Sequence, residues 1–349
     1  MSDAQAPLPS PPPGAVIMQM LLARMVTQAI GVAALYGFAD HLASGPQSAE
    51  ELAQLTGTHA PSVYRLLRAL AASGIFAEIF VEAGGAGGRF ENTPLSDALR
   101  KDVPGSVHGL AMMFSHDVHI KAWLGLAHSV KTGESGFEHS LGEPIWSYFR
   151  GHPDASAIFD DAMTSGTAQM AAAAVAAYDF SGINTLVDVG GGRGGLMAAI
   201  LAKHPEVRGV VFDQPHVVEG TRPLLEASGV ADRCRIVGGD FFKEVPEGDA
   251  FVLKSITHDW NDDDAVAILK TVARAARPGA RLLLIEAVIK PGNEADMNKT
   301  VDLEMLVMTN GGRERTAKEF DELVTRAGFT PSRIVETGGP VQVIEAIRA

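Results

Sequence analysis

The apolar residues near the start of the chain follow a helical period. Over residues 18–35 they cover most of a helix, which leaves too little polar surface for a solvated helix, so several of its sides must be covered. A subunit interface could supply that cover. The apolar stretch 15–35 is also long enough for a membrane span, but Gln19, Arg24 and Thr27 interrupt it and favour a buried helix with one polar edge.

Two helices and two strands are predicted after this first helix. A capping box at residues 48–51 opens one helix, and Pro61 opens the next. Two short strands follow, and a glycine-rich loop joins them. The predicted helices cover residues 48–56 and 61–72, the strands 75–81 and 88–92, and the loop 84–88. Together these elements describe a winged helix.

A winged helix either binds DNA or forms dimers. A module that reads bases needs a basic second helix, whereas this one offers only Arg65 and Arg68. The formal net charge of −13 also opposes attraction to nucleic acid and to anionic membranes. We therefore expect a dimerisation module, no nucleic-acid partner and no membrane span.

The pattern of apolar residues changes near residue 180. Before it, aromatic, Met, His and small residues at helical spacing predict a helical connector. After it, apolar runs separated by amphipathic helices predict a parallel sheet with right-handed crossovers. The predicted parallel strands are 185–189, 209–212, 235–237, 250–253 and 281–285, and 332–336 with 341–346 form a closing antiparallel pair.

The chain of 349 residues is longer than one hydrophobic core usually supports. Cys234 is its only cysteine, so no intramolecular disulfide can form, and the proline-rich start lacks the basic region of a secretory signal. Both features suit a cytoplasmic protein. We expect a flexible tail (1–13), a winged-helix-like dimerisation domain (14–102), a helical connector (103–180) and a Rossmann-like α/β domain (181–349).

The strongest local signal is LVDVGGGRGG at residues 186–195, a buried strand that runs into a glycine turn and then a helix. Such a turn lets a ligand approach the backbone, and Gly190, Gly192 and Gly195 match a dinucleotide fingerprint. Alone it does not separate NAD, FAD and S-adenosylmethionine, and a tight turn without a ligand is the structural alternative. Asp188 favours S-adenosylmethionine, because an acid there has the wrong sign for a pyrophosphate but suits the amino group of a methionine moiety.

The next strand ends offer groups that fit a nucleoside. Asp213 stands where an acid can accept both ribose hydroxyls, of NAD as well as of S-adenosylmethionine. Gly239 opens the sequence GDFF, in which Asp240 could accept an adenine amine and Phe241 could cover the purine ring. An ordinary turn with its phenylalanines in the core is the alternative. Lys254 could close the cofactor edge or simply be solvated.

His258 follows the fourth parallel strand, at the edge where open α/β sheets bind ligands. Glu286 ends the fifth strand and Glu314 lies in GGRERT, so two carboxylates could converge on the imidazole, orient it and raise its basicity. The alternative pairs Glu286 with Lys290 or Arg281, and Glu314 with a neighbouring arginine.

Taken in order, these motifs resemble the class I small-molecule O-methyltransferases, which include plant caffeic-acid-type enzymes and bacterial enzymes that tailor aromatic antibiotics and carotenoids. The resemblance covers nearly the whole chain and rests on LVDVGGGRGG at 186–195, FDQPHV at 212–217, GDFF at 239–242, LKSITHDWNDDDA at 253–265, and DLEML with GGRERTAKEF at 302–320. It implies a Rossmann-like methyltransferase sheet, a winged-helix-like N-terminal dimerisation domain and a homodimer.

The resemblance also implies roles for individual residues. It assigns His258 as the base that takes a proton from the acceptor's hydroxyl, flanked by Glu286 and Glu314. It assigns S-adenosylmethionine to Gly190, Asp213, Asp240, Phe241 and Lys254, beside Asp188, Gly192 and Gly239 from the residue-level reasoning. We expect no metal, because the consecutive acids 262–264 cannot face one ion from a helix and a solvated helix start explains them.

The acceptor is then expected to be a small, hydroxylated and aromatic molecule. Its pocket would be built from the connector and from the segment near residue 305, although Met and aromatic residues at helical spacing also suit plain core. The expected walls are Phe114, Trp123, Phe137, Phe159, Met163, Met305, Met308 and Asn310.

Two positions depart from the family pattern. Arg193 places a cation in the glycine turn, which is unhelpful near a sulfonium unless the side chain points away or pairs with a carboxylate. Thr257 replaces the cysteine often found before the histidine in the plant branch, which suggests a bacterial relative. Two other classes stay open from the residues alone: an NAD(P)-dependent oxidoreductase with the same turn, and a winged-helix regulator with a nucleotide-sensing domain.

Overall fold

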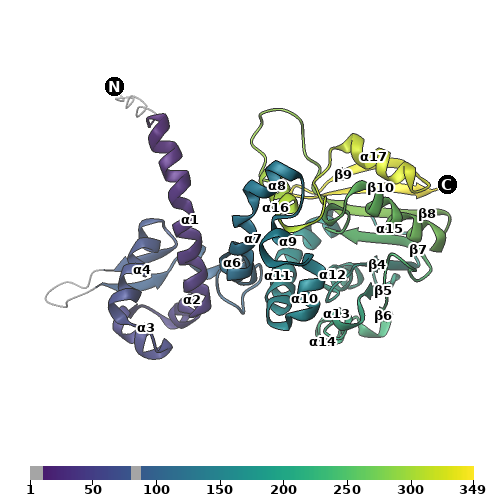
Figure 1. The fold of residues 1–349 in the computed structure, drawn as a ribbon. Coiled ribbons are helices and arrows are strands. Elements are labelled where there is room, and N and C mark those ends of the chain that lie inside the picture. The colour runs from purple at the N-terminus through teal and green to yellow at the C-terminus, as the bar shows by residue number, and fades with distance from the viewer. Residues whose placement is uncertain (1–10, 80–87) are drawn as a thin grey trace, which may run out of the picture. The chain divides into compact units, whose positions relative to one another are not determined.

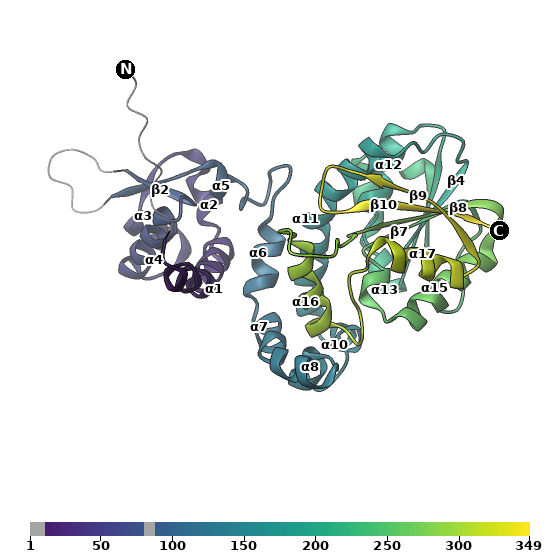
Figure 2. The same ribbon diagram turned by 90° about the horizontal axis from the view of Figure 1, so that it is seen from above.

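The computed structural model describes residues 11–79 and 88–349 and divides into an N-terminal unit, Met1–His116, and a C-terminal unit, Asp117–Ala349 (Figures 1 and 2). In the N-terminal unit the helices are α1 (Pro13–Leu35), α2 (Phe38–His41), α3 (Ala49–Thr56), α4 (Ala60–Ala72), α5 (Pro94–Asp97) and α6 (His108–Ser115). Its strands β1 (Gln47–Ser48), β2 (Phe76–Ile79) and β3 (Arg89–Asn92) form an antiparallel sheet in the order β1-β3-β2.

Local sequence chemistry explains this unit. The predicted capping box forms, because Glu51 N donates to Ser48 Oγ and Ser48 N donates to Glu51 Oε2. The fully buried side chains of Leu52, Leu67 and Phe90 fix α3, α4 and the strand pair around one core. Most of the predicted glycine-rich loop, residues 84–87, lies outside the described residues.

Helix α1 has the apolar character that the sequence predicts. It packs on the rest of the unit through its C-terminal half, where Ala33 and Ala34 are buried and Val26 and Ile30 are partly buried against the core. Large apolar side chains on its earlier turns stay exposed, including Met20 at 65%, Leu21 at 65% and Met25 at 69%. Within the described residues, α1 is the one helix long and apolar enough to cross a membrane by length and composition.

The C-terminal unit begins with the predicted helical connector. It consists of α7 (Asp117–Leu124), α8 (Leu126–Thr132), α9 (Gly136–Leu141), α10 (Ile145–Gly151) and α11 (Pro153–Ala177). Helix α16 (Asn298–Met308), from late in the chain, packs against α7, α8 and α9 (Figure 2). Val118, Phe137, Phe149 and Val307 share the resulting core.

A mostly parallel sheet forms the centre of the C-terminal unit. Its order within the described residues is β6-β5-β4-β7-β8-β10-β9, and β10 runs antiparallel to both of its neighbours. The closing antiparallel pair is therefore confirmed. The strands are β4 (Thr185–Val189), β5 (Arg208–Asp213), β6 (Cys234–Gly238), β7 (Gly248–Lys254), β8 (Ala276–Glu286), β9 (Phe329–Glu336) and β10 (Gln342–Arg348).

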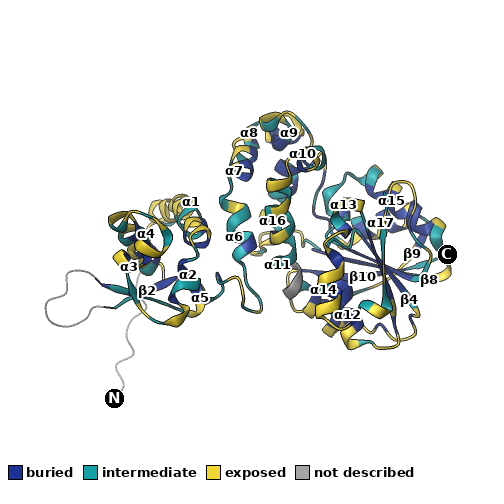
Figure 3. Cartoon of the chain, turned by 90° about the horizontal axis from the view of Figure 1, so that it is seen from below, coloured by how far each residue is buried: buried dark blue, intermediate teal, exposed yellow. Residues whose placement is uncertain are grey.

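Alternating side chains divide the sheet between two layers of helices. Leu282 and Leu284 face the core shared with α15 (Asp262–Ala275) and α17 (Ala317–Arg326), whereas Leu283 faces the core shared with α11 and α12 (Gly195–Lys203). Two short helices, α13 (Pro215–Val218) and α14 (Thr221–Ala227), complete the unit. Figure 3 shows the central strands buried and the outer surfaces of the helices exposed. Because β4 to β8 run parallel to one another, their carboxyl ends meet at one edge of the sheet.

Candidate active site

The glycine turn after β4 packs closely against its neighbours. Gly190 has φ +74°, and a Cβ there would lie 2.4 Å from Cδ1 of Ile256. Gly192 has φ +56°, and a Cβ there would meet nothing within 4 Å. Gly239, after β6, would bring a Cβ within 2.4 Å of the Phe212 ring. A side chain at Gly190 or Gly239 would therefore displace its neighbour, whereas Gly192 borders open space.

Two acids occupy the ends of β4 and β5. Asp188 is 1% exposed, and its Oδ2 has no hydrogen-bond partner among the described residues. Burial raises the pKa of Asp188 to about 7. Asp213 accepts hydrogen bonds from Gly192 N (2.9 Å) and Gln214 N (2.6 Å). Burial raises the pKa of Asp213, and these two backbone bonds oppose that rise. The turn is thus held by one of the predicted acids and flanked by the other.

The end of β6 is more open than the ends of β4 and β5. Asp240 accepts a hydrogen bond from Phe242 N (3.0 Å), and an ion pair with Lys243 (3.0 Å) lowers its pKa. The Phe241 ring lies edge-on to Trp260, with 6.1 Å between the ring centroids. Phe241 is only partly buried beside the core.

Lys254 ends β7 between acidic groups. Burial lowers the pKa of its ammonium group, and the carboxylates of Glu286 and Asp188 oppose that effect. The next residue, Ser255, has φ +53°, a conformation that side-chain-bearing residues rarely adopt. Such strain is typical of functional sites, and here it directs the chain from the strand into the turn that carries His258.

His258 lies in a short 3₁₀ turn, Thr257–Asp259, and makes one of the two predicted carboxylate bonds. Its Nδ1 is 2.8 Å from Glu314 Oε1 and 3.8 Å from Glu286 Oε2. Its Nε2 is 3.6 Å from Asp259 Oδ1, which is longer than an ordinary hydrogen bond. Glu314 therefore orients the ring and leaves Nε2 as the nitrogen that can meet a substrate.

Glu286 has a different task from Glu314. Its Oε1 accepts hydrogen bonds from Ile256 N (3.0 Å), Thr257 N (2.8 Å) and Thr257 Oγ1 (2.8 Å). Glu286 is 1% exposed, and its Oε2 has no hydrogen-bond partner among the described residues. This carboxylate fixes the backbone of the turn and adds negative charge beside the imidazole of His258.

The electrostatic balance at His258 favours the protonated ring. Burial lowers the pKa of His258, but the carboxylates of Glu286, Asp259 and Glu314 outweigh burial and raise that pKa to about 10. Burial also raises the pKa of Asp259 to about 7. The sequence assigned Asp259 no role, because its position next to His258 does not show whether its carboxylate faces the imidazole.

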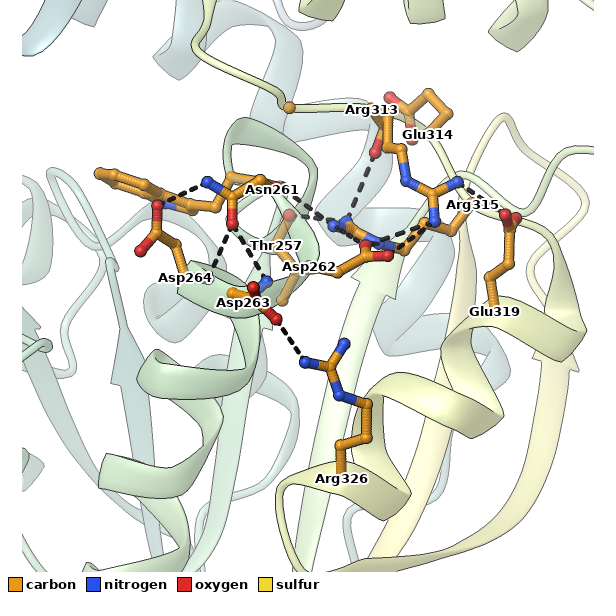
Figure 4. A network of polar contacts seen from close by, with 12 residues as sticks. Thr257, Asn261, Asp262, Asp263, Asp264, Arg313, Glu314, Arg315, Glu319 and Arg326 are labelled. Carbon is orange, nitrogen blue, oxygen red and sulfur yellow. Dashed lines mark hydrogen bonds and ion pairs between the residues drawn. The ribbon is translucent and has the colours of Figure 1, made fainter.

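A network of ion pairs on the other side of the turn was also missed. Figure 4 shows Arg313 and Arg315 converging on Asp262 at the start of α15. The acids 262–264 do lie in the first turn of α15, as predicted, but Asp262 also binds a fully buried arginine, which the sequence did not indicate. Asp263 pairs with Arg326 instead. The repeated acids gave no signal that would separate these partners.

The structure gives Arg193 a partner. Its Nη1 donates to Asp161 Oδ1 (2.6 Å), and its Nη2 is 3.6 Å from Asp160 Oδ2. Both aspartates belong to α11, so the glycine turn is tied to the helical connector. The cation therefore pairs with carboxylates, which was one of the two arrangements that could accommodate it.

The predicted walls of the acceptor pocket fall into several environments. Phe137 and Met308 lie in the buried core of the connector, Phe159 packs against it, and Met305 is also buried. Met163 is partly buried on α11, Asn310 is exposed and donates to Glu138 Oε2 (2.6 Å), and Phe114 is 41% exposed in the N-terminal unit. Trp123 donates to Glu304 Oε2 (2.6 Å), whose Oε1 is 2.9 Å from His119 Nε2. This His–Glu–Trp contact was not predicted.

Comparison with known proteins decides between the classes that the residues leave open. Residues 123–330 match the O-methyltransferase domain, and residues 18–102 match the O-methyltransferase dimerisation domain. The chain belongs to the O-methyltransferase family.

Similar proteins support this assignment along nearly the whole chain. It is 41% identical over 336 residues to a phenazine O-methyltransferase of Lysobacter antibioticus, covering 96% of both chains. It is 41% identical to the mitomycin biosynthesis 6-O-methyltransferase of Streptomyces lavendulae, covering 92% of this chain and 91% of that one. A solved methyltransferase of calicheamicin biosynthesis, in its S-adenosylhomocysteine-bound form, is 34% identical with a TM-score of 0.81, covering 96% and 98% of the two chains.

The family fixes the reaction class and the methyl donor. This O-methyltransferase uses S-adenosylmethionine and belongs among enzymes of secondary metabolite biosynthesis. The oxidoreductase alternative is thereby excluded, and the N-terminal unit carries the dimerisation domain expected from its apolar helix.

Proposed function

We propose that this O-methyltransferase transfers a methyl group to a hydroxyl of a small aromatic molecule, with His258 as the general base. One observation carries the proposal: Glu314 holds Nδ1 of a partly buried imidazole and leaves Nε2 to receive a proton. The phenazine O-methyltransferase among its relatives acts, by its name, on an aromatic ring system. The aromatic residues gathered in the connector, including Trp146 and Phe159, offer a suitable surface for such a ring.

The strand ends supply groups that would hold the donor. The unpartnered, buried Oδ2 of Asp188 suits the amino group of the methionine moiety, because an ammonium would compensate a carboxylate that burial otherwise disfavours. Asp213 would accept the ribose hydroxyls, and Asp240 with Phe241 would hold the adenine. Gly190, Gly192, Gly239 and Lys254 would complete the site. When bound, S-adenosylmethionine supplies a methyl group made reactive by its sulfonium.

A base is needed because a phenol with a pKa of about 10 is only about one part in a thousand ionised at neutral pH. His258 Nε2 would take the hydroxyl proton as the oxygen attacks. Since the pKa of His258 is raised to about 10, only the minor, neutral form of the ligand-free enzyme is a base. A cation bound at Asp188 would neutralise that carboxylate and leave Lys254 to offset the charge of Glu286. Because the charge of Glu286 raises the pKa of His258, that pKa should then fall.

The homodimer belongs to the same proposal. Exposed apolar residues on the early turns of α1, such as Leu21 and Met25, would be covered by a second copy of the chain. The match of residues 18–102 to the dimerisation domain supports this use of the helix.

The test is methyl transfer to a panel of hydroxylated aromatic molecules, among them a hydroxyphenazine, measured by mass spectrometry of the product. We expect a methyl ether, and His258→Ala should lower kcat by about 10²- to 10⁴-fold with little change in S-adenosylhomocysteine affinity. Activity of this variant should partly return as the pH approaches the pKa of the acceptor's hydroxyl, because an ionised acceptor needs no base. His128→Ala, on α8, is the matched control and should behave as wild type.

Two results would contradict the proposal. Wild-type turnover by His258→Ala at neutral pH would remove the base and leave positioning as the source of catalysis. Methylation confined to amine or carbon acceptors would overturn the hydroxyl.

A further inference from the structure

A buried arginine frames the turn that carries His258. Arg315 is 0% exposed, and Figure 4 shows its guanidinium reaching toward the turn. Nη1 donates to the carbonyl oxygen of Thr257 (2.7 Å), and Nη2 donates to that of Trp260 (2.8 Å). One planar group thereby binds the carbonyls on both sides of His258.

The same guanidinium is itself fixed by a carboxylate. Its Nε and Nη2 donate to Asp262 Oδ1 at 3.0 and 2.8 Å. Asp262 begins α15, so the helix start, the turn and the segment that contains Arg315 are joined at one point. Because both donors converge on one carboxylate oxygen, this edge of the guanidinium is held against Asp262.

Arg315 also follows Glu314 directly in the chain. The residue that clamps the turn and the residue that binds His258 Nδ1 therefore move as one segment. The backbone adds a further contact, because Arg313 N donates to the carbonyl oxygen of His258 (2.8 Å). Gly312 permits this approach, since a Cβ there would lie 2.5 Å from the same carbonyl oxygen.

Such an arrangement is costly if packing is its only purpose. Removing a guanidinium from water is unfavourable, and apolar residues of similar volume often replace buried ion pairs without loss of stability. What apolar side chains cannot supply is a set of donors that ties two carbonyls to one carboxylate. Lysine has the charge but not the planar fork.

We propose that Arg315 is a positioning residue for proton transfer, which sets the His258–Glu314 hydrogen bond by clamping the His258 turn to the segment that carries Glu314. The inference rests on the proposed role of His258. Arg315 does not touch the reacting atoms, so its effect should appear in kcat and in the pH dependence of the reaction more than in donor binding.

The test compares full-length Arg315→Lys with Arg326→Lys. Arg326 also pairs with an acid at the start of α15, namely Asp263, but its recorded ion pair does not involve the turn that carries His258. We expect Arg315→Lys to lower kcat at neutral pH by about 10- to 100-fold, the effect of a small misplacement of a catalytic group. The rising limb of its pH–rate profile should move to lower pH, since a weakened contact with Glu314 favours the protonated imidazole less. S-adenosylhomocysteine affinity should stay within about twofold, and Arg326→Lys should match wild type.

Asp262→Asn provides a second variant if Arg315→Lys folds poorly. It keeps the arginine and removes the charge that fixes its plane, so the same pH shift with a smaller loss of kcat is expected. The inference is overturned if folded Arg315→Lys keeps the kcat and pH profile of wild type. If Arg315→Lys does not fold, the same result in Asp262→Asn overturns it. His258→Ala, measured in parallel, separates the two proposals: if it retains wild-type turnover the base itself fails, whereas if it alone is impaired only the role of Arg315 fails.

Discussion

Glu314 and His258 stand 56 residues apart in the sequence, yet Oε1 of one lies 2.8 Å from Nδ1 of the other. The bond crosses from the turn after β7 to the segment between α16 and α17. A second contact supports it from behind, because Glu314 N donates to Asp302 Oδ1 on α16 (2.8 Å). Glu314 is thus held at both its backbone and its side chain, and it can impose one orientation on the imidazole.

Replacing this carboxylate should shift the pH dependence of catalysis. In Glu314→Gln the imidazole loses one of the charges that raise its pKa, so the neutral form appears at lower pH and the rising limb of kcat moves in that direction. The plateau of kcat should fall, because glutamine no longer selects the tautomer that leaves Nε2 as the proton acceptor. A pH–rate profile checks this, with the exposed Glu322→Gln on α17 as the control. An unshifted limb would show that His258 does not govern it.

The sequence predicted most of the fold because its signals are local. The apolar runs, the capping box at Ser48 and the glycine turn each determine a nearby element, and the strands at 185–189 and 250–253 fall within β4 and β7. The carboxyl edge of the sheet then follows from the topology. That argument brings His258 and Glu286 together, whereas Glu314 ends no strand and could be offered only as a second carboxylate able to converge on the imidazole.

The division of labour within the site could not be predicted in the same way. Glu286 and Glu314 look alike as sequence, but one binds the turn backbone and the other binds the ring. Tertiary packing decides which carboxylate reaches the ring: Glu314 Oε1 lies 2.8 Å from Nδ1 of His258, and Glu286 Oε2 lies 3.8 Å from it. For the same reason, the burial of Arg315 and its bond to Asp262 had no local signature.

Removing the buried charge of Asp188 should stabilise the ligand-free protein at alkaline pH. Its folded-state pKa, about 7, lies above its value in the unfolded chain, so its contribution to stability is present at acidic pH and lost as the pH rises to about 7. Asp188→Asn should therefore raise Tm at pH 8 and change it little at pH 4. At pH 8 the expected gain in the free energy of unfolding is about 1–4 kcal/mol. Differential scanning calorimetry at the two pH values measures this, and equal effects at both would contradict it. The same variant should bind S-adenosylhomocysteine more weakly.

Chelation should leave the reaction unchanged. Ligand atoms of His258, Glu286 and Glu314 lie within 4.8 Å of one another, a spacing that could also hold a metal ion. The hydrogen bond between His258 and Glu314 accounts for that geometry without one. Incubation with EDTA, followed by gel filtration into metal-free buffer, should therefore preserve kcat. Loss of activity that added Zn²⁺ or Mg²⁺ restores would assign the cluster to a metal.

A charge on the exposed face of α1 should separate the two copies of the dimer. Met25 and Leu124 are both 69% exposed, but Met25 lies on α1 and Leu124 on α7. Met25→Glu should shift the mass measured by light scattering toward that of the monomer, because a carboxylate buried without a partner is strongly disfavoured. Leu124→Glu should leave the dimer intact. A monomeric wild-type protein would refute the homodimer itself.

Asp213 should hold S-adenosylmethionine by accepting hydrogen bonds from the two ribose hydroxyls of that donor. An analogue of S-adenosylhomocysteine that lacks both hydroxyls can isolate this contact. A hydrogen bond to a charged acceptor contributes about 1.5–3 kcal/mol, so Asp213→Ala should weaken S-adenosylhomocysteine by at least about tenfold. The substitution also releases Gly192 N and Gln214 N, which could loosen the glycine turn and weaken any ligand.

The analogue separates these effects: wild type should bind it much less tightly than S-adenosylhomocysteine, whereas Asp213→Ala should bind the two ligands almost equally. Calorimetry of both proteins with both ligands gives the comparison, and Asp232→Ala, an exposed acid before β6, serves as the control. If the hydroxyls contribute the same free energy with and without the Asp213 carboxylate, that carboxylate only shapes the turn and another group binds the ribose.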